Sequence, residues 1–187
     1  MENDKIFKDL NPVIMDDNNT VIALEEPKDI GIITDRVLLA RKGRDITLDM
    51  LEETRECLEK MYKVMYEDKN AAGVAAQQVG YDLNAFLMKN SDNEVVCVLN
   101  PKMKLIKPSK YTFKSVEKCL SVPEGAYEVK RCSVIKTRYQ DENLKYVEKR
   151  YKNIFACIFQ HELDHINGIL ICDKGKEVED NSINYTI

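Results

Sequence analysis

The sequence has no apolar run of the about 18 residues that a membrane-spanning helix requires. Its acidic N-terminus also lacks the basic and apolar regions of a secretion signal. The net charge is −4, and no stretch combines clustered basic residues with aromatic ones. We therefore expect a cytoplasmic protein that binds neither nucleic acid nor membranes directly.

The sequence also contains no closely spaced pair of cysteines and few histidines. The six cysteines, at positions 57, 97, 119, 132, 157 and 172, include no C-x-x-C pair, so the sequence does not indicate a disulfide framework. Most of them are expected to be small buried hydrophobic residues. The two histidines, in contrast, lie together in one motif.

Hydrophobic residues make up 44% of the 187 positions, which is enough for a single domain with a real core. We place this catalytic domain over residues 31–175. Residues 1–30 form an N-terminal extension of unknown role, either a marginal hairpin or a loose arm, and residues 176–187 form a polar tail.

Hydrophobic periodicity predicts a long helix in the N-terminal half, over residues 45–70. Its apolar stripe consists of Leu48, Leu51, Leu58, Met61 and Met65. Between positions 83 and 151 the period changes to two, which is typical of antiparallel strands. The strand-like runs are 84–89, 94–99, 103–106, 111–116, 127–139 and 144–151.

An apolar helix is predicted over residues 153–166 and ends at Asn167-Gly168, a good C-terminal cap. The chain after Asp173 is polar and is expected to be frayed. The fold class is therefore α+β, with antiparallel β-sheets packed around a central buried helix and a long helix in the N-terminal half.

The central helix carries the sequence Gln-His-Glu-Leu-Asp-His at positions 160–165, an H-E-x-x-H motif. Side chains four residues apart share one helix face, so His161 and His165 can bind one metal ion. Glu162 is placed to handle a proton on water rather than to act as a ligand. A solvated helix face is the alternative, but the apolar run at 154–159 indicates a buried helix. Buried histidines and carboxylates need partners, which favours a metal site.

A catalytic metal site usually takes three protein ligands. Spacing alone leaves cysteine, aspartate and glutamate open as the third ligand. Among the cysteines, Cys119 is distinctive because it follows a strand and precedes Pro123, which bends the chain.

Three motifs, in one order, resemble those of the peptide deformylases. The family shows G-x-G-L-A-A-x-Q, E-G-C-L-S and Q-H-E-x-D-H, and this chain has AAGVAAQQ at 71–78, EKCLS at 117–121 and QHELDH at 160–165. The resemblance implies removal of the N-formyl group from the N-terminal formyl-methionine of nascent polypeptides near the ribosome, with release of formate. It also implies a divalent metal bound by Cys119, His161 and His165, most commonly Fe(II), which Zn(II), Ni(II) or Co(II) can replace.

The resemblance further assigns catalytic roles. Glu162 would carry a proton from the attacking water to the leaving amine. The side-chain amide of Gln78 and the backbone N–H of Leu120 would stabilise negative charge on the formyl oxygen. Without the motif, Gln78 would be interpreted as a surface amide on a loop.

Substrate binding can be predicted from the same segments. Ile154, Cys157 and Ile158 lie on the face of His161 and would form either an apolar slot for a methionine side chain or plain core. The backbone around residues 72–74, which are Ala72, Gly73 and Val74, could pair with an extended peptide as an added strand. This mode tolerates varied sequences.

The chain also departs from the family pattern. Ala71 replaces the first glycine of the loop, and Lys118 replaces the glycine before the cysteine, where glycine permits unusual backbone angles. Ala126 stands where many members carry an arginine that helps to hold the peptide, and Lys130 or Arg131 are candidate substitutes. The tail lacks the basic helix by which some bacterial members dock at the ribosome.

Two alternative functions follow from these observations. The short H-E-x-x-H motif alone is compatible with a metallopeptidase that cuts internal peptide bonds. The departures are compatible with a catalytically weak, deformylase-like binder of formylated peptides.

Overall fold

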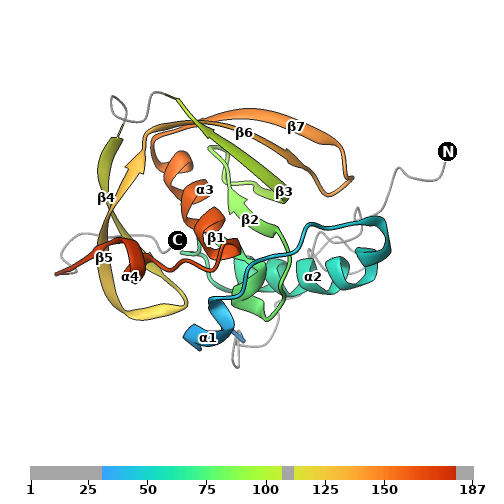
Figure 1. Ribbon diagram of the computed structural model, residues 1–187, viewed down its shortest axis with the longest axis horizontal. Helices are drawn as coiled ribbons and strands as arrows, with labels where there is room; N and C mark the ends of the chain where they lie inside the picture. The colour runs from blue at the N-terminus through green and yellow to red at the C-terminus, as the bar shows by residue number, and fades with distance from the viewer. Residues whose placement is uncertain (1–30, 107–111, 180–187) are drawn as a thin grey trace, which may run out of the picture.

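The computed structural model describes residues 31–106 and 112–179 (Figure 1). The predicted hairpin or arm over residues 1–30 lies outside the described residues. The α+β prediction is confirmed, because two antiparallel sheets pack with a central helix and a long helix. No described helix combines the length and the apolar character needed to span a membrane.

The larger sheet has five strands in the order β1-β2-β3-β6-β7, and each neighbouring pair is antiparallel. Its strands are β1 (Gly73–Ala75), β2 (Ala85–Lys89), β3 (Val95–Leu105), β6 (Val134–Gln140) and β7 (Tyr146–Lys152). The runs predicted at 94–99 and 103–106 are one strand, β3, with a register shift between Leu99 and Lys102. Pro101 is tolerated there because a bulge leaves a residue outside the hydrogen-bond ladder.

The smaller sheet contains β4 (Thr112–Cys119), β5 (Val122–Cys132) and β8 (Lys176–Val178) in that order. The single strand predicted at 127–139 was wrong, because the chain leaves β5 at Cys132 and enters β6, in the other sheet, at Val134. Apolar residues continue on both sides of Ser133 and no glycine or proline separates them, so the sequence does not mark this break.

The C-terminal segment is more ordered than predicted. After α4 (Ile171–Lys174), β8 pairs with β5 through Ala126↔Val178 and two further pairs. The frayed end predicted after Asp173 is therefore wrong for residues 174–178. Three residues are too few to show a strand period, so the pairing could not be recognised from the sequence.

Helix α3 (Asn153–Ile166) is the predicted central helix and lies against both sheets. Phe159 anchors it on the larger sheet, with its ring edge-to-face on Phe86 at a centroid distance of 5.0 Å and tilted against Tyr151 at 5.5 Å. The Gln160 amide accepts a hydrogen bond from the backbone N–H of Cys132 and donates one to its carbonyl. This pairing fixes α3 against the end of β5.

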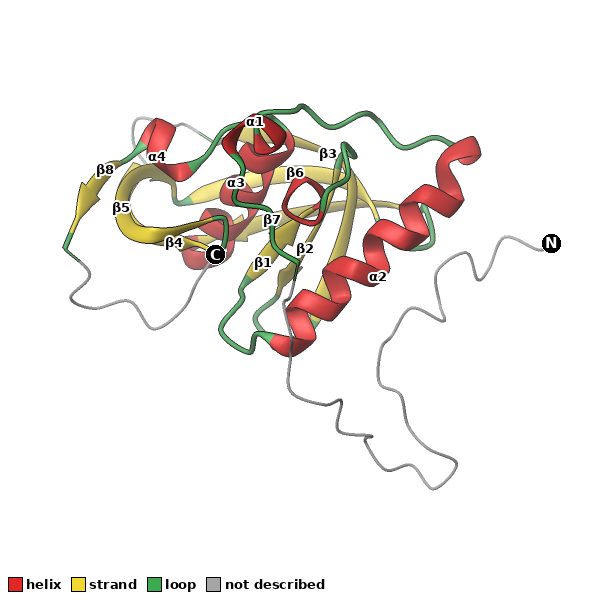
Figure 2. Cartoon of the chain, turned by 90° about the horizontal axis from the view of Figure 1, so that it is seen from below, coloured by secondary structure: helices red, strands yellow, loops and turns green. Residues whose placement is uncertain are grey.

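Helix α2 (Leu51–Glu67) covers β1 and β2 (Figure 2). Leu58, Met61 and Met65 are buried as predicted. Leu48, however, is 73% exposed, because it belongs to a preceding 3-10 turn, η2 (Leu48–Met50), where the helical period does not yet hold. Two short elements, α1 (Arg36–Leu39) and η3 (Ala76–Val79), were not predicted.

The aromatic contacts of Phe159 give a test of the packing. Phe159→Ala removes a fully buried ring and should lower the free energy of unfolding by about 3–5 kcal/mol. Val37→Ala, at a position 78% exposed, should change it by less than about 0.5 kcal/mol. Urea denaturation of the metal-free proteins measures both. Equal effects of the two substitutions would show that Phe159 does not anchor α3.

Candidate metal centre and active site

Three potential metal ligands converge from two elements. Cys119 ends β4, and His161 and His165 lie one turn apart on α3. The Sγ of Cys119 is 3.2 Å from the Nε2 of His165, and the ligand atoms of the three residues lie within 4.8 Å of one another. All three side chains are buried. The structure therefore brings together the three residues that the resemblance implied as ligands.

The hydrogen bond of His161 and the neutral state of His165 suit a bound cation. The Nδ1 of His161 lies 2.9 Å from a carboxylate oxygen of Glu117, and this contact fixes Nδ1 as a donor and leaves Nε2 available to bind a metal. Nε2 of His161 has no hydrogen-bond partner among the described residues. Burial holds the pKa of His165 well below its usual value, so this imidazole is neutral, as a ligand must be.

The thiol of Cys119 also indicates a site for a cation. Burial raises its pKa to about 12, so on its own it would stay protonated at neutral pH. A divalent cation deprotonates a coordinating thiol. One thiolate and two imidazoles form a donor set that suits iron, zinc, nickel or cobalt, so these residues fit a bound divalent cation.

Glu162 lies fully buried beside the ligands. Neither of its carboxylate oxygens has a hydrogen-bond partner in the described part of the chain, and burial raises its pKa well above the usual value. Gly73 of β1 lies directly against it, since a Cβ added there would be only 2.9 Å from the Cδ of Glu162. The glycine therefore lets the backbone of β1 approach the carboxylate, and no larger residue fits without displacing Glu162.

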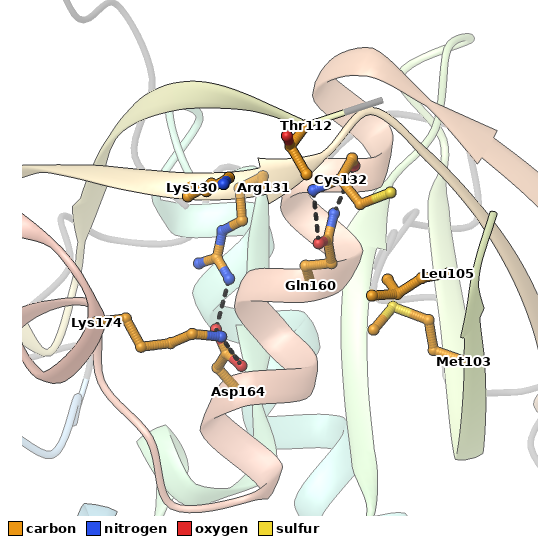
Figure 3. Close-up of a pocket in the computed structure, with 9 residues that line it drawn as sticks. All are labelled: Met103, Leu105, Thr112, Lys130, Arg131, Cys132, Gln160, Asp164 and Lys174. Carbon is orange, nitrogen blue, oxygen red and sulfur yellow. Dashed lines mark hydrogen bonds and ion pairs between the residues drawn. The ribbon is translucent and has the colours of Figure 1, made fainter. Parts of the chain in front are cut away.

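A buried ion-pair network holds the ligands in place. Arg131 is 2% exposed and donates to both oxygens of Glu117, at 2.8 and 2.7 Å, and also to Asp164. Lys174 of α4 donates to the same Asp164 (Figure 3). Burial alone would raise the pKa of Glu117, but Arg131 and His161 outweigh it and lower that pKa to about 2. Glu117 is therefore a fixed anion that orients His161.

The network was missed in the sequence, although two of its members lie inside recognised motifs. Glu117 precedes the cysteine by two residues, and Asp164 precedes His165. Acidic side chains within otherwise buried elements were the available signal. Because Arg131 is fully engaged in this network, it is not a substitute for the missing peptide-holding arginine.

Gln78 lies on η3 and is fully buried, so the surface-loop interpretation is wrong. Its side-chain oxygen accepts from the backbone N–H of Ala75 at 2.8 Å, which aims its amide nitrogen at Ser121 and Cys119. That nitrogen is 3.3 Å from the Ser121 hydroxyl and 3.8 Å from the Cys119 sulfur. Leu120 is partly buried in the turn that follows Cys119. Both residues therefore border the candidate metal position.

A cavity of about 400 Å³ lies between β4 and the first turns of α3. It is lined by Phe113, Ser115, Ser133, Asn153, Ile154 and Cys157. Cys157 lies one turn before His161 on α3, and Ser115 lies two residues before Glu117 on β4. Ile158 does not line it and packs in the core instead. Of the three residues predicted for the methionine slot, Ile154 and Cys157 line this cavity and Ile158 does not.

Strand β1 forms one edge of the larger sheet and, among the described strands, pairs with β2 alone. It contains Gly73 and Val74 and follows Ala72, whose carbonyl accepts from the backbone N–H of Lys89. An edge strand is the geometry that accepts an added peptide strand.

The family model for polypeptide deformylase matches residues 27–181. The peptide deformylase of Thermotoga maritima is 39% identical over 145 residues, which cover 78% of this chain and 85% of that protein. The chain belongs to the peptide deformylase family. Its fold resembles the crystal structure of the Thermotoga maritima peptide deformylase, with a TM-score of 0.64, 37% identity and coverage of 73% and 90% of the two chains.

A second peptide deformylase, from Synechococcus elongatus in complex with actinonin, superposes with a TM-score of 0.69 at 26% identity. The match covers 82% of this chain and 81% of that chain. The family resemblance therefore extends well beyond the three motifs, over both sheets and the central helix.

The departures from the deformylase motifs are accommodated locally. Ala71 is fully buried in the cluster beneath α2, where its methyl group packs. Lys118 lies at a register shift in β4 and is not among the residues with positive φ, so its backbone angle carries no penalty. Ala126 is fully buried and pairs with Val178 of β8. None of the three substitutions strains the site.

Substitution of Arg131 tests whether the buried ion-pair network stabilises the fold. Arg131→Met keeps the apolar stem but leaves Glu117 and Asp164 without their shared cation, so we expect a loss of about 3–5 kcal/mol in the free energy of unfolding. The matched control is Lys114→Met, which breaks the exposed pair with Glu128 and should cost less than about 1 kcal/mol. Chemical denaturation compares the two variants, and a small cost at Arg131 would refute the network's role.

Proposed function

We propose that this protein removes the N-formyl group from the N-terminal formyl-methionine of nascent polypeptides in the cytoplasm. The reaction breaks the formyl C–N bond with one water molecule and yields formate and a free α-amine. The convergence of Cys119, His161 and His165 beside the buried Glu162 carries this proposal. Family membership supports the same reaction.

Cys119, His161 and His165 would hold one divalent cation, which we propose to be Fe(II) in the cell, with Zn(II), Ni(II) or Co(II) able to replace it. When bound, this cation supplies the Lewis acidity that activates water near neutral pH and polarises the formyl carbonyl. The Glu117 carboxylate keeps the His161 imidazole in the ligating tautomer.

Glu162 would carry the proton. Burial raises its pKa, and no described side chain competes for its oxygens, so it can accept a proton from the attacking water and give it to the leaving amine. The Gln78 amide and the backbone N–H of Leu120 would donate to the formyl oxygen as negative charge develops there. The Gln78 donor is oriented by its side-chain oxygen, which accepts a hydrogen bond from the backbone N–H of Ala75.

The cavity that contains Ile154 and Cys157 would take the methionine side chain. The following residues of the substrate would extend along the edge of β1, at Ala72, Gly73 and Val74, and pair with its backbone. Backbone pairing is independent of sequence, as an enzyme acting on many nascent chains requires.

Formate release from a formyl-methionyl tripeptide tests this proposal directly. The protein, purified anaerobically and loaded with Fe(II), should release one formate per peptide and leave unformylated peptides intact. Cleavage of an internal bond would favour the metallopeptidase alternative. Binding of the formylated peptide without formate release would favour the catalytically weak binder.

Glu162→Gln separates proton transfer from metal binding. The amide keeps the shape of the carboxylate but cannot carry the proton, so kcat should fall by about 10²–10⁴ while metal content is unchanged. Steady-state formate release and elemental analysis measure the two quantities. Loss of metal from a folded variant would identify Glu162 as a ligand instead.

Cys119→Ser tests the third ligand. A hydroxyl is a much poorer ligand than a thiolate, so the variant should retain clearly less metal at limiting metal concentration. Cys172→Ser, which changes a cysteine outside the ligand set, should retain the wild-type amount. Equal retention by both variants would exclude the sulfur of Cys119 from the metal centre.

A further inference from the structure

One face of the larger sheet carries a concentration of positive charge. Alternate residues of β3, β6 and β7 point away from α3 and are exposed. We call this surface the basic face, and its cations are Lys102, Lys104, Lys136, Arg138, Arg150 and Lys152. Register places them on one side, because Lys104 pairs with Lys136, and Lys136 pairs with Arg150.

The opposite side of the same strands packs against α3. Ile135, Tyr139 and Tyr151 point to that side and are buried. In Figure 1, α3 lies on one side of β6 and β7, and no described helix lies on the other side. Helix α2 contacts β1 and β2, whereas the basic face lies on β3, β6 and β7. Among the described residues, the basic face is therefore not covered by a helix.

Few acidic groups offset these cations. Glu148 lies 3.5 Å from Lys136, and Asp45 lies 3.9 Å from Lys102, and both pairs are exposed. The face therefore has six cations against two carboxylates, on a protein whose net charge is −4. Exposed pairs of this kind are weak and screened by salt, so they do not neutralise the surface.

An aromatic side chain stands at the edge of the basic face. Tyr146 is 66% exposed, and the guanidinium of Arg138 lies 4.4 Å from its ring centroid. Neighbouring strands are about 4.8 Å apart and alternate residues about 6.6 Å apart, so the cations are regularly spaced next to the exposed Tyr146 ring. Proteins that bind single-stranded nucleic acid combine these two features.

We propose that the basic face binds the phosphate backbone of single-stranded RNA. Lysine and arginine contacts to phosphates need no base recognition, and the exposed Tyr146 ring offers a stacking partner for one base. An anionic membrane is the weaker fit, because Val134, which points to the basic face, is partly buried and offers little apolar surface to insert into lipid. This inference replaces the sequence-based expectation of no nucleic-acid partner and does not depend on the proposed catalytic function.

The basic face could not be recognised from the sequence, for a physical reason. The cations occupy every second position of three strands that are separated in the chain, and buried residues lie between them. Neither the net charge nor a run of like charges along the sequence reveals these cations, because strand pairing brings them together on one face.

The test changes three neighbouring cations of the basic face, Lys104, Lys136 and Arg150, together to glutamate. We call this triple substitution the row variant. The control changes Lys42, Lys63 and Lys69, three exposed lysines outside the basic face, to glutamate. Both triple variants shift the net charge by −6, from −4 to −10. Fluorescence anisotropy with a labelled 20-nucleotide uridine strand, at several salt concentrations, measures RNA binding by the full chain.

Wild-type protein should bind the strand with an affinity that falls with salt. The row variant should bind at least about tenfold more weakly, with a salt slope reduced by about 2, whereas the control should stay within about twofold of wild type. Formate release from a short formyl peptide should be the same in all three proteins. Circular dichroism checks folding, and glutamine at the same three positions replaces glutamate if the row variant unfolds.

Three outcomes would overturn the proposal. Wild-type protein that does not bind the strand even at low salt has no RNA site. Equal weakening in both triple variants would mean that overall charge, not the basic face, governs binding. Binding to phosphatidylserine vesicles but not to the strand would assign the basic face to lipid.

Discussion

The site depends on the burial of four ionisable side chains in one apolar region. Cys119, His161, Glu162 and His165 are each at most 2% exposed. A charge buried alone costs several kcal/mol, so a fold that keeps such groups must supply partners for them. A cation bound by Cys119, His161 and His165 would supply partners for three of them. Glu117, which is held by its ion pair with Arg131, supplies a further partner to the Nδ1 of His161.

The two sheets meet at this buried region, and each contributes different residues to the site. The smaller sheet delivers Cys119, Glu117 and Arg131, and the larger sheet delivers the Gly73 backbone. Helix α3 lies between them and carries both histidines and Glu162. Catalytic geometry therefore follows from the packing of α3, in which Gln160 and Phe159 are the anchoring side chains.

Much of this could be predicted from the sequence, because the signals are local. The H-E-x-x-H spacing marks one helix face, and the change of period from helix to strand marks the α+β class. Long-range pairing was not accessible in the same way. The sequence alone left the third ligand open, joined β5 to β6, divided β3 at Pro101 and left Lys176–Val178 without structure. The Glu117 network also requires contacts between β4, β5 and α3 that no periodicity encodes.

The most direct test of the metal centre is X-ray absorption spectroscopy of the Zn(II)-loaded protein. We predict one sulfur ligand at about 2.3 Å and nitrogen ligands at about 2.0–2.1 Å, from Cys119 and the two histidines. The sulfur shell should disappear in Cys119→Ser. A coordination shell of nitrogen and oxygen alone in the unmodified protein would contradict the central claim that Cys119, His161 and His165 bind one ion.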